Sequence, residues 1–238
     1  MNRRIWGCAL GTYYVPKAYA GEAGRIPGAN AMRSLFYRVK NNRPLPLPPE
    51  RIRHEDIGDI TVTVENAMTV CRDIAQERWK TVAALLQING EPIALVPIPS
   101  STATAANWRT TRFPTWALAQ ALGQAVHPSV VTVCIVQKHE RPSKLKQGRD
   151  ARVTASGLTS IASIPTSHRI VLVDDLVTTG SSVIAMDRLL DNRVHGVITV
   201  GVNDTSSCVH AATLRGFTIE YDAAAPQLPS RPSLVLAN

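Results

Sequence analysis

Two carboxylates and four hydroxyl groups follow one another closely in the segment DDLVTTGSS, residues 174–182. The carboxylates belong to Asp174 and Asp175, and the hydroxyl groups belong to Thr178, Thr179, Ser181 and Ser182. Gly180 permits a tight turn and a close approach of the backbone to a ligand. The hydroxyl groups, with the free N–H groups of a following helix, favour a bound phosphate. The acids would repel that phosphate, so we expect them to bind sugar hydroxyls, or Mg²⁺ through water.

The sequence on either side predicts the elements that position these groups. Residues 170–173 form a short aliphatic run, typical of a strand buried on both faces of a parallel sheet. Residues 182–190 carry apolar side chains at helical spacing. Ligands of open α/β sheets bind at the carboxyl ends of strands, so this segment predicts a pocket for a phosphorylated sugar. The alternative, a surface turn with a serine N-cap, would need one hydroxyl group rather than four.

The order of apolar strand, two acids and Thr-Thr-Gly-Ser-Ser resembles the phosphoribosyl-pyrophosphate (PRPP) motif of type I phosphoribosyltransferases. The resemblance covers about residues 92–201 and is greatest to the competence-protein-F-like branch of that family. It is carried by VPIPSS (96–101), a later basic loop and LVDDLVTTGSS (172–182), with FYRVKN (36–41) upstream. Two features of the branch are missing, because the chain has no paired Cys-x-x-Cys and has WRTTRFP (108–114) in place of Arg-Gly-Phe-Asn.

The resemblance implies an open parallel-sheet, Rossmann-like α/β core that uses PRPP and Mg²⁺. It implies that residues 178–182 bind the 5′-phosphate, that Asp174 and Asp175 bind the ribose hydroxyls and Mg²⁺, and that Ser100 and Ser101 bind pyrophosphate. A basic loop, residues 138–152, would close over the reaction centre; its candidate catalytic residues are Arg141, Lys144, Lys146 and Arg149. An exposed charged loop with no such role is the alternative.

The acceptor of the phosphoribosyl group stays open. Purine-salvage relatives carry an aspartate base where this chain has Thr178, which argues against hypoxanthine or guanine as the acceptor. A different class of function is a regulatory module that binds PRPP or a nucleotide without transferring it, with a basic N-terminal face that binds DNA or RNA. A further alternative is an enzyme that acts on, or is held by, a nucleic acid, as effectors of bacterial defence systems are.

The first part of the chain is strongly basic. Ten of the 26 Lys and Arg residues lie in residues 1–53 against two acids, Glu22 and Glu50, so this segment alone accounts for the net charge of +8. It also holds six of the twelve aromatic residues. Such a segment could bind DNA or RNA, or form a solvated basic face. A proline-rich connector at 44–49 divides the chain into a basic N-terminal extension or hood, residues 1–50, and a phosphoribosyltransferase-like domain, residues 51–238.

The remaining composition favours a cytoplasmic protein. The four cysteines are widely spaced, which favours free thiols in a reducing compartment over zinc ligation. No apolar run is long enough to span a membrane, and residues 1–20 make a poor signal peptide because glycines and Pro16 interrupt them. A homodimer, or an assembly with another protein, stays open.

Periodicity predicts the other elements. We expect helices over residues 29–40, 62–86, 114–126 and 208–214, and strands over 92–97, 130–136, 195–202 and 217–221. Residues 222–238 contain three prolines and are expected to form an irregular tail.

Overall fold

The structure is a computed structural model of the chain. It describes residues 2–13, 29–41, 48–88, 90–111, 113–126, 129–139, 157–203, 213–224 and 233–236.

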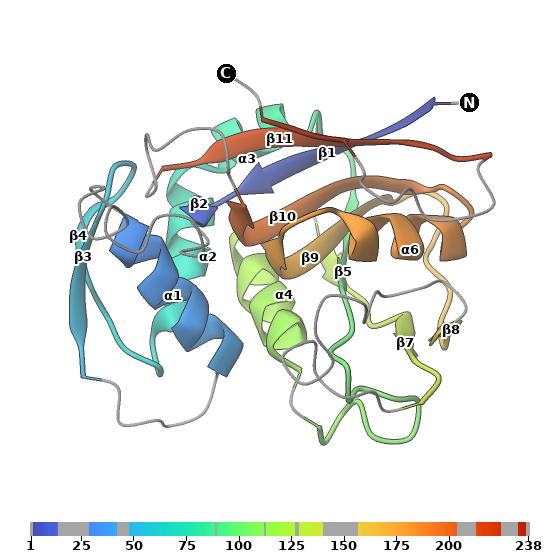
Figure 1. Cartoon of the computed structure of the whole chain (residues 1–238), viewed down its shortest axis with the longest axis horizontal. Helices are drawn as coiled ribbons and strands as arrows, with labels where there is room; N and C mark the ends of the chain where they lie inside the picture. Colours follow the sequence, from blue (N-terminus) through green and yellow to red (C-terminus); the bar gives the residue numbers. More distant parts are fainter. Residues whose placement is uncertain are drawn as a thin grey trace.

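An eight-stranded sheet forms the centre of the molecule (Figure 1). Its strands are β1 (Asn2–Ala9), β2 (Thr12–Tyr13), β5 (Ile93–Pro97), β6 (Ser129–Val131), β9 (Arg169–Val177), β10 (Val194–Asn203), β11 (Arg215–Asp222) and β12 (Ser233–Leu236). Their order is β12-β11-β1-β10-β9-β5-β6, and β2 pairs with β10 beyond the end of β1. The pairs from β1 to β6 are parallel, whereas β11 runs antiparallel to both β1 and β12. The predicted mostly parallel α/β core is therefore present.

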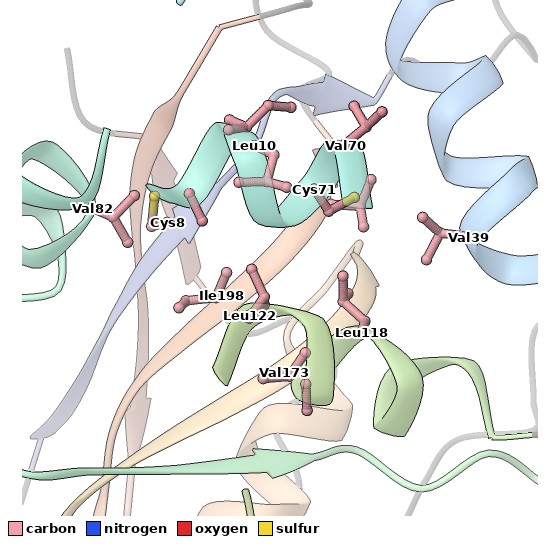
Figure 2. Close-up of a cluster of buried hydrophobic side chains, with 14 of the residues drawn as sticks. Cys8, Leu10, Val39, Val70, Cys71, Val82, Leu118, Leu122, Val173 and Ile198 are labelled. Carbon is pink, nitrogen blue, oxygen red and sulfur yellow. The ribbon is translucent and has the colours of Figure 1, made fainter. Parts of the chain in front are cut away.

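Helices cover both faces of this sheet. The helices are α1 (Ala29–Asn41), α2 (Ala67–Glu77), α3 (Trp79–Leu85), α4 (Pro114–Ala125) and α6 (Ser181–Leu189). Buried side chains of α1, α2 and α4 pack with Val171 and Val173 of β9, as the close-up of this cluster shows for Val173 (Figure 2). Side chains of α6 pack with Ile170 and Leu172 in a second cluster. Because successive residues of β9 enter different cores, the strand is buried on both faces, as its aliphatic run predicts.

Two small antiparallel pairs lie outside the main sheet. The β3 (Glu50–His54) and β4 (Gly58–Val62) hairpin follows the proline-rich connector. The β7 (Ile135–Gln137) and β8 (Leu158–Ser160) pair closes the base of the predicted basic loop. The single strand expected over 130–136 is therefore two strands, because β6 pairs with β5 whereas β7 pairs with β8.

The basic N-terminal segment contributes to the main sheet. Strand β1 lies between β10 and β11, and Ile5 and Cys8 are fully buried. Helix α1 also packs in the core, through residues that include Leu35 and Val39. The described parts of residues 1–50 therefore contribute to the same sheet and core as later residues. The arginines of β1 pair with carboxylates while its apolar side chains are buried.

The helix expected over 62–86 is also two helices. Val62 pairs with Glu50 in the hairpin, and Asn66 then accepts the Thr63 N–H through Oδ1 at 2.7 Å, so α2 begins only at Ala67. Arg78 separates α2 from α3 with φ −111° and ψ 23°, outside the helical region. The predicted irregular tail contains the edge strand β12, and most of the helix expected over 208–214 lies outside the described residues.

Three of the four cysteines, Cys8, Cys71 and Cys134, are buried free thiols. Burial, with a smaller contribution from the nearby Asp56 carboxylate, raises the pKa of Cys8 to about 12. Burial also raises the pKa of Cys134 to about 12. These thiols are therefore protonated and unreactive at neutral pH. None of the described helices is long and apolar enough to cross a membrane.

Candidate active site at the carboxyl edge of the sheet

The hydroxyl-rich segment forms the turn between β9 and α6. Helix α6 begins at Ser181, and Gly180 occupies its N-cap position with φ 76° and ψ 0°. This left-handed conformation is one that glycine adopts without strain, as the sequence predicted. The hydroxyl oxygens of Thr179 and Ser181 lie 2.9 Å apart, which closes the turn from the outside. Thr178 and Thr179 are exposed, and Ser181 and Ser182 are half-buried, so the turn presents hydroxyl groups beside the positive end of a helix.

Gly180 is required by space as well as by backbone conformation. A Cβ atom at this position would lie 3.0 Å from two side-chain carbons of Ile219 on β11. Ile219 is fully buried in the core that also contains Val183 and Ile184 of α6. The β9–α6 turn is therefore held against a rigid part of the core rather than exposed on a free loop.

Asp174 is the last residue of the continuous buried stretch of β9, and Asp175 follows it in the same strand. Asp174 pairs in register with Thr199 of β10, and its side chain is largely buried, with 9% of the residue exposed. Its Oδ1 accepts the backbone N–H of Asp175 at 2.8 Å. Asp175 is half-buried. One carboxylate is thus fixed by the backbone of the other, directly before the hydroxyl-rich turn.

The segment with Ser100 and Ser101 leaves the sheet next to these acids. Pro97 of β5 pairs with Val173 of β9, and the Ile98 N–H donates to the Val173 carbonyl at 2.9 Å. We call residues 99–103 the Pro/Ser loop. The Pro/Ser loop therefore starts beside Asp174, whereas β9 continues to Val177 before the hydroxyl-rich turn begins. Both of its serines are half-buried, and Ser100 Oγ lies 3.5 Å from Thr102 Oγ1.

Three side chains that the sequence did not single out support the Pro/Ser loop. Thr115, at the start of α4, donates its hydroxyl to the Ile98 carbonyl at 2.6 Å. Thr111 donates to Thr102 Oγ1 at 3.4 Å. Gln137 is the last residue of β7, and its amide nitrogen lies 3.5 Å from the Pro99 carbonyl oxygen. The one signal in the sequence was position, since Gln137 lies between the strand expected over 130–136 and the basic loop at 138–152.

The candidate basic residues Arg141, Lys144, Lys146 and Arg149 lie outside the described residues. The structure does describe the base of their loop, where the Lys138 N–H donates to the Gly157 carbonyl at 3.0 Å. The loop therefore leaves from β7 and returns to β8, beside the Pro/Ser loop that Gln137 contacts.

The oxygen donors at the carboxyl edge of the sheet fit Mg²⁺ better than they fit a metal ion whose ligands all come from the protein. Among the described residues no group of three or more His, Cys, Asp and Glu side chains could hold an ion. The adjacent carboxylates of Asp174 and Asp175 supply the oxygen ligands that Mg²⁺ prefers. Mg²⁺ usually keeps several waters and takes its other ligands from substrate phosphates, so two carboxylates suffice.

The sequence of the chain matches a known protein family. Residues 63–214, more than half of the chain, match the phosphoribosyl transferase domain family, and that stretch contains both loops and both acids. The chain has no significant match among curated protein sequences. A solved hypoxanthine phosphoribosyltransferase from Staphylococcus aureus is 12% identical, with 61% of this chain and 77% of that chain covered and a TM-score of 0.31. An adenine phosphoribosyltransferase structure is 16% identical, with 71% and 90% covered and a TM-score of 0.32. Likenesses this weak add no weight, but the sequence match is sufficient, and the chain belongs to the phosphoribosyl transferase domain family.

Proposed function

We propose that the chain is a phosphoribosyltransferase that uses PRPP and Mg²⁺ and releases pyrophosphate. The observation that carries the proposal is the meeting of two loops at one edge. Asp174 and Asp175 lie in the last part of β9, directly before the hydroxyl-rich turn. The Pro/Ser loop that follows β5 starts beside these acids, where the Ile98 N–H donates to the Val173 carbonyl. A substrate with a phosphate at one end and a diphosphate at the other could contact both loops at once.

In this proposal the β9–α6 turn binds the 5′-phosphate. Its groups are the hydroxyls of Thr178, Thr179, Ser181 and Ser182, the backbone of Gly180 and the N-terminus of α6. Fixed N–H dipoles need no reorganisation when the anion binds, which makes them effective phosphate ligands. Because the turn rests on Ile219, the phosphate end of the substrate would be held in one position.

The acids bind the ribose end. Asp174 and Asp175 accept hydrogen bonds from the ribose 2′- and 3′-hydroxyls and hold Mg²⁺ directly or through water. Bound Mg²⁺ offsets the negative charge of the diphosphate group. The N–H donated by Asp175 to Asp174 fixes one carboxylate in place before substrate arrives.

The Pro/Ser loop binds the leaving group. Ser100, Ser101 and the backbone N–H groups of this loop contact the diphosphate, and Arg141, Lys144, Lys146 and Arg149 close over it from the basic loop. The bond from C1 of the ribose to the diphosphate oxygen breaks, and that oxygen keeps the electron pair. The C1 atom then gains positive character, which closure protects from water. An acceptor nucleophile forms the new bond to C1.

The acceptor must lose its proton without help from residue 178. A threonine hydroxyl is no base at neutral pH, so Thr178 cannot take a proton from a purine ring. We therefore propose an acceptor other than hypoxanthine or guanine. Assignment to the competence-protein-F-like branch and to the cytoplasm belongs to the same proposal, and rests on the VPIPSS and LVDDLVTTGSS segments and on the buried free cysteines.

The basic N-terminal residues give less support to nucleic-acid binding than their number suggests. Among the described residues, Arg3 pairs with Asp187, Arg4 with Glu220, Arg38 with Glu50 and Arg51 with Asp59. Each pair cancels a charge that a phosphate backbone would otherwise meet. We therefore do not extend the proposal to DNA or RNA.

A pyrophosphate-release assay tests the proposal. PRPP and Mg²⁺ are mixed with the protein and with pools of nucleobases, amines and small nucleophiles. Release that depends on one pool, and that disappears in an Asp174→Asn, Asp175→Asn double variant, would support transfer. PRPP binding without release from any pool would favour the regulatory module, and absence of PRPP binding would contradict the proposal.

A further inference from the structure

Gln137 contacts both ends of the Pro/Ser loop. It is the last residue of β7 and is 99% buried, with a relative exposure of 1%. Its backbone N–H donates to the Ala103 carbonyl at 2.8 Å, and its backbone forms a parallel bridge with Thr104. Its side-chain Nε2 lies 3.5 Å from the Pro99 carbonyl. One residue therefore fixes both the first and the last residue of the loop, and Ser100 and Ser101 lie between the two contacts.

The side chain of Gln137 gains little from this arrangement as a core residue. Its Oε1 atom is buried and has no hydrogen-bond partner among the described residues. The bond from Nε2 is at the long limit for a hydrogen bond. Buried amides normally satisfy both of their polar ends, and an unpaired one costs more than an apolar side chain of the same shape. A purely structural role would be better filled by leucine or methionine, so the amide itself requires another reason.

The same residue stands at the base of the basic loop. The next residue, Lys138, donates its N–H to the Gly157 carbonyl at 3.0 Å, and Gln137 pairs with Leu158 across β7 and β8. A shift in the position of β7 would therefore move the Pro/Ser loop. It would also move β8, the strand to which the basic loop returns. Gln137 thus contacts the Pro/Ser loop and also lies in the strand pair from which the basic loop extends.

We propose that Gln137 is a positioning residue for the pyrophosphate end of the substrate. Its amide sets the spacing of Pro99 and Ala103, and its unpaired Oε1 accepts a donor from the Pro/Ser loop when that loop closes on a diphosphate. Gln137 does not itself touch the substrate; it acts through the loop. This inference rests on the proposed function, because it assumes that the Pro/Ser loop binds the diphosphate.

The test compares three ligands by calorimetry, each with Mg²⁺. Ribose 5-phosphate reports on the β9–α6 turn, inorganic pyrophosphate on the Pro/Ser loop, and PRPP on both. The variant is Gln137→Met, which keeps the volume and removes the amide. The matched control is Gln120→Met, the same change at an exposed position of α4.

We expect Gln137→Met to weaken the binding of PRPP and of pyrophosphate about tenfold, which is the effect of one lost buried hydrogen bond. The affinity for ribose 5-phosphate should change by less than about twofold. The control should leave all three unchanged. Unchanged PRPP affinity in Gln137→Met would overturn the inference, and so would an equal loss for all three ligands, since that indicates general damage to the fold. Failure of the wild type to bind PRPP would instead overturn the proposed function, and the inference with it.

Discussion

The backbone N–H of Ile98 donates to the carbonyl of Val173 at 2.9 Å, one residue before Asp174. This bond joins the end of β5 to β9 at the point where the chain leaves β5, while β9 continues in the sheet to Val177. The Pro/Ser loop and the acidic, hydroxyl-rich turn are thereby fixed relative to each other by backbone geometry. Side-chain changes in either loop should therefore alter ligand binding without moving the other loop.

A Gly180→Ala substitution should remove phosphate binding at a modest cost in stability. The new methyl group meets Ile219 and the residue must keep φ 76°, which is strained for alanine. We expect a loss of about 1–3 kcal/mol in the free energy of unfolding, and a loss of more than about tenfold in affinity for ribose 5-phosphate, which calorimetry measures.

The matched control for this substitution is Gly90→Ala. Gly90 has φ 73° but an added Cβ would meet nothing within 4 Å, and it lies before β5, at the opposite edge of the sheet. It should lose similar stability and keep ribose 5-phosphate affinity. Equal ligand affinity in both variants would show that the β9–α6 turn is not the phosphate site.

Arg3 should matter for stability rather than for nucleic-acid binding. Its Nε donates to the buried carboxylate of Asp187 at 3.1 Å and its Nη2 to the Val194 carbonyl at 2.6 Å. Arg3→Gln leaves Asp187 partly unpaired in the core, which should cost about 1–3 kcal/mol in thermal or urea unfolding. Arg53→Gln, an exposed change in β3, should cost less than about 0.5 kcal/mol.

The same two variants test the nucleic-acid alternative. Titration with single-stranded and duplex oligonucleotides at low salt should give no difference among the wild type and the two variants. A marked loss of oligonucleotide affinity in either variant would restore the basic N-terminal segment as a binding surface.

Asp56 should give the fold an acid-sensitive contribution to stability. Burial raises the pKa of Asp56, but the Leu214 N–H, the Arg78 side chain and the His54 charge together hold it below its ordinary value. A carboxyl whose pKa is lowered by folding stabilises the protein above its unfolded pKa of about 4, and that contribution is lost as pH falls through the folded pKa. The wild type should therefore lose stability below about pH 4.

Asp56→Asn should reduce that acid dependence. At neutral pH we expect it to cost about 1–2 kcal/mol, since the half-exposed Arg78 is partly screened by solvent. Between pH 4 and more acid conditions its unfolding free energy should fall less steeply than that of the wild type. The comparison variant is Asp59→Asn, whose pair with Arg51 is exposed and should contribute less than about 1 kcal/mol. Parallel curves for wild type and Asp56→Asn would contradict the assignment.

The sequence predicts the β9–α6 turn well because its determinants are local. An aliphatic run, a glycine and a helical period lie within about twenty consecutive residues, and each has its own backbone consequence. Ser100 and Ser101 could be placed near the turn only through the resemblance, since nothing in VPIPSS itself specifies which strand lies beside it. The pairing of Pro97 with Val173 supplies that information.

Features that depend on distant residues escaped prediction. Strand β1 takes its place through pairs such as Trp6 with Gly196, which no local pattern encodes. The break at Arg78 occurs where that side chain reaches Asp56 in the β3–β4 hairpin at 2.8 Å. Gln137 was overlooked because its importance comes from two carbonyls more than thirty residues earlier in the chain.

The most direct measurement is a calorimetric titration of the protein with PRPP in the presence of Mg²⁺. It should be run on the wild type, on the Asp174→Asn, Asp175→Asn double variant, and on the control Asp191→Asn. The control removes one carboxylate charge by the same substitution, at an exposed residue with φ 56°. Asparagine tolerates that left-handed conformation, so this control should fold normally. We predict binding by the wild type and by Asp191→Asn, and none by a double variant that melts as one cooperative unit. Equal binding by all three proteins, or none by the wild type, would contradict the placement of a PRPP site at this edge of the sheet.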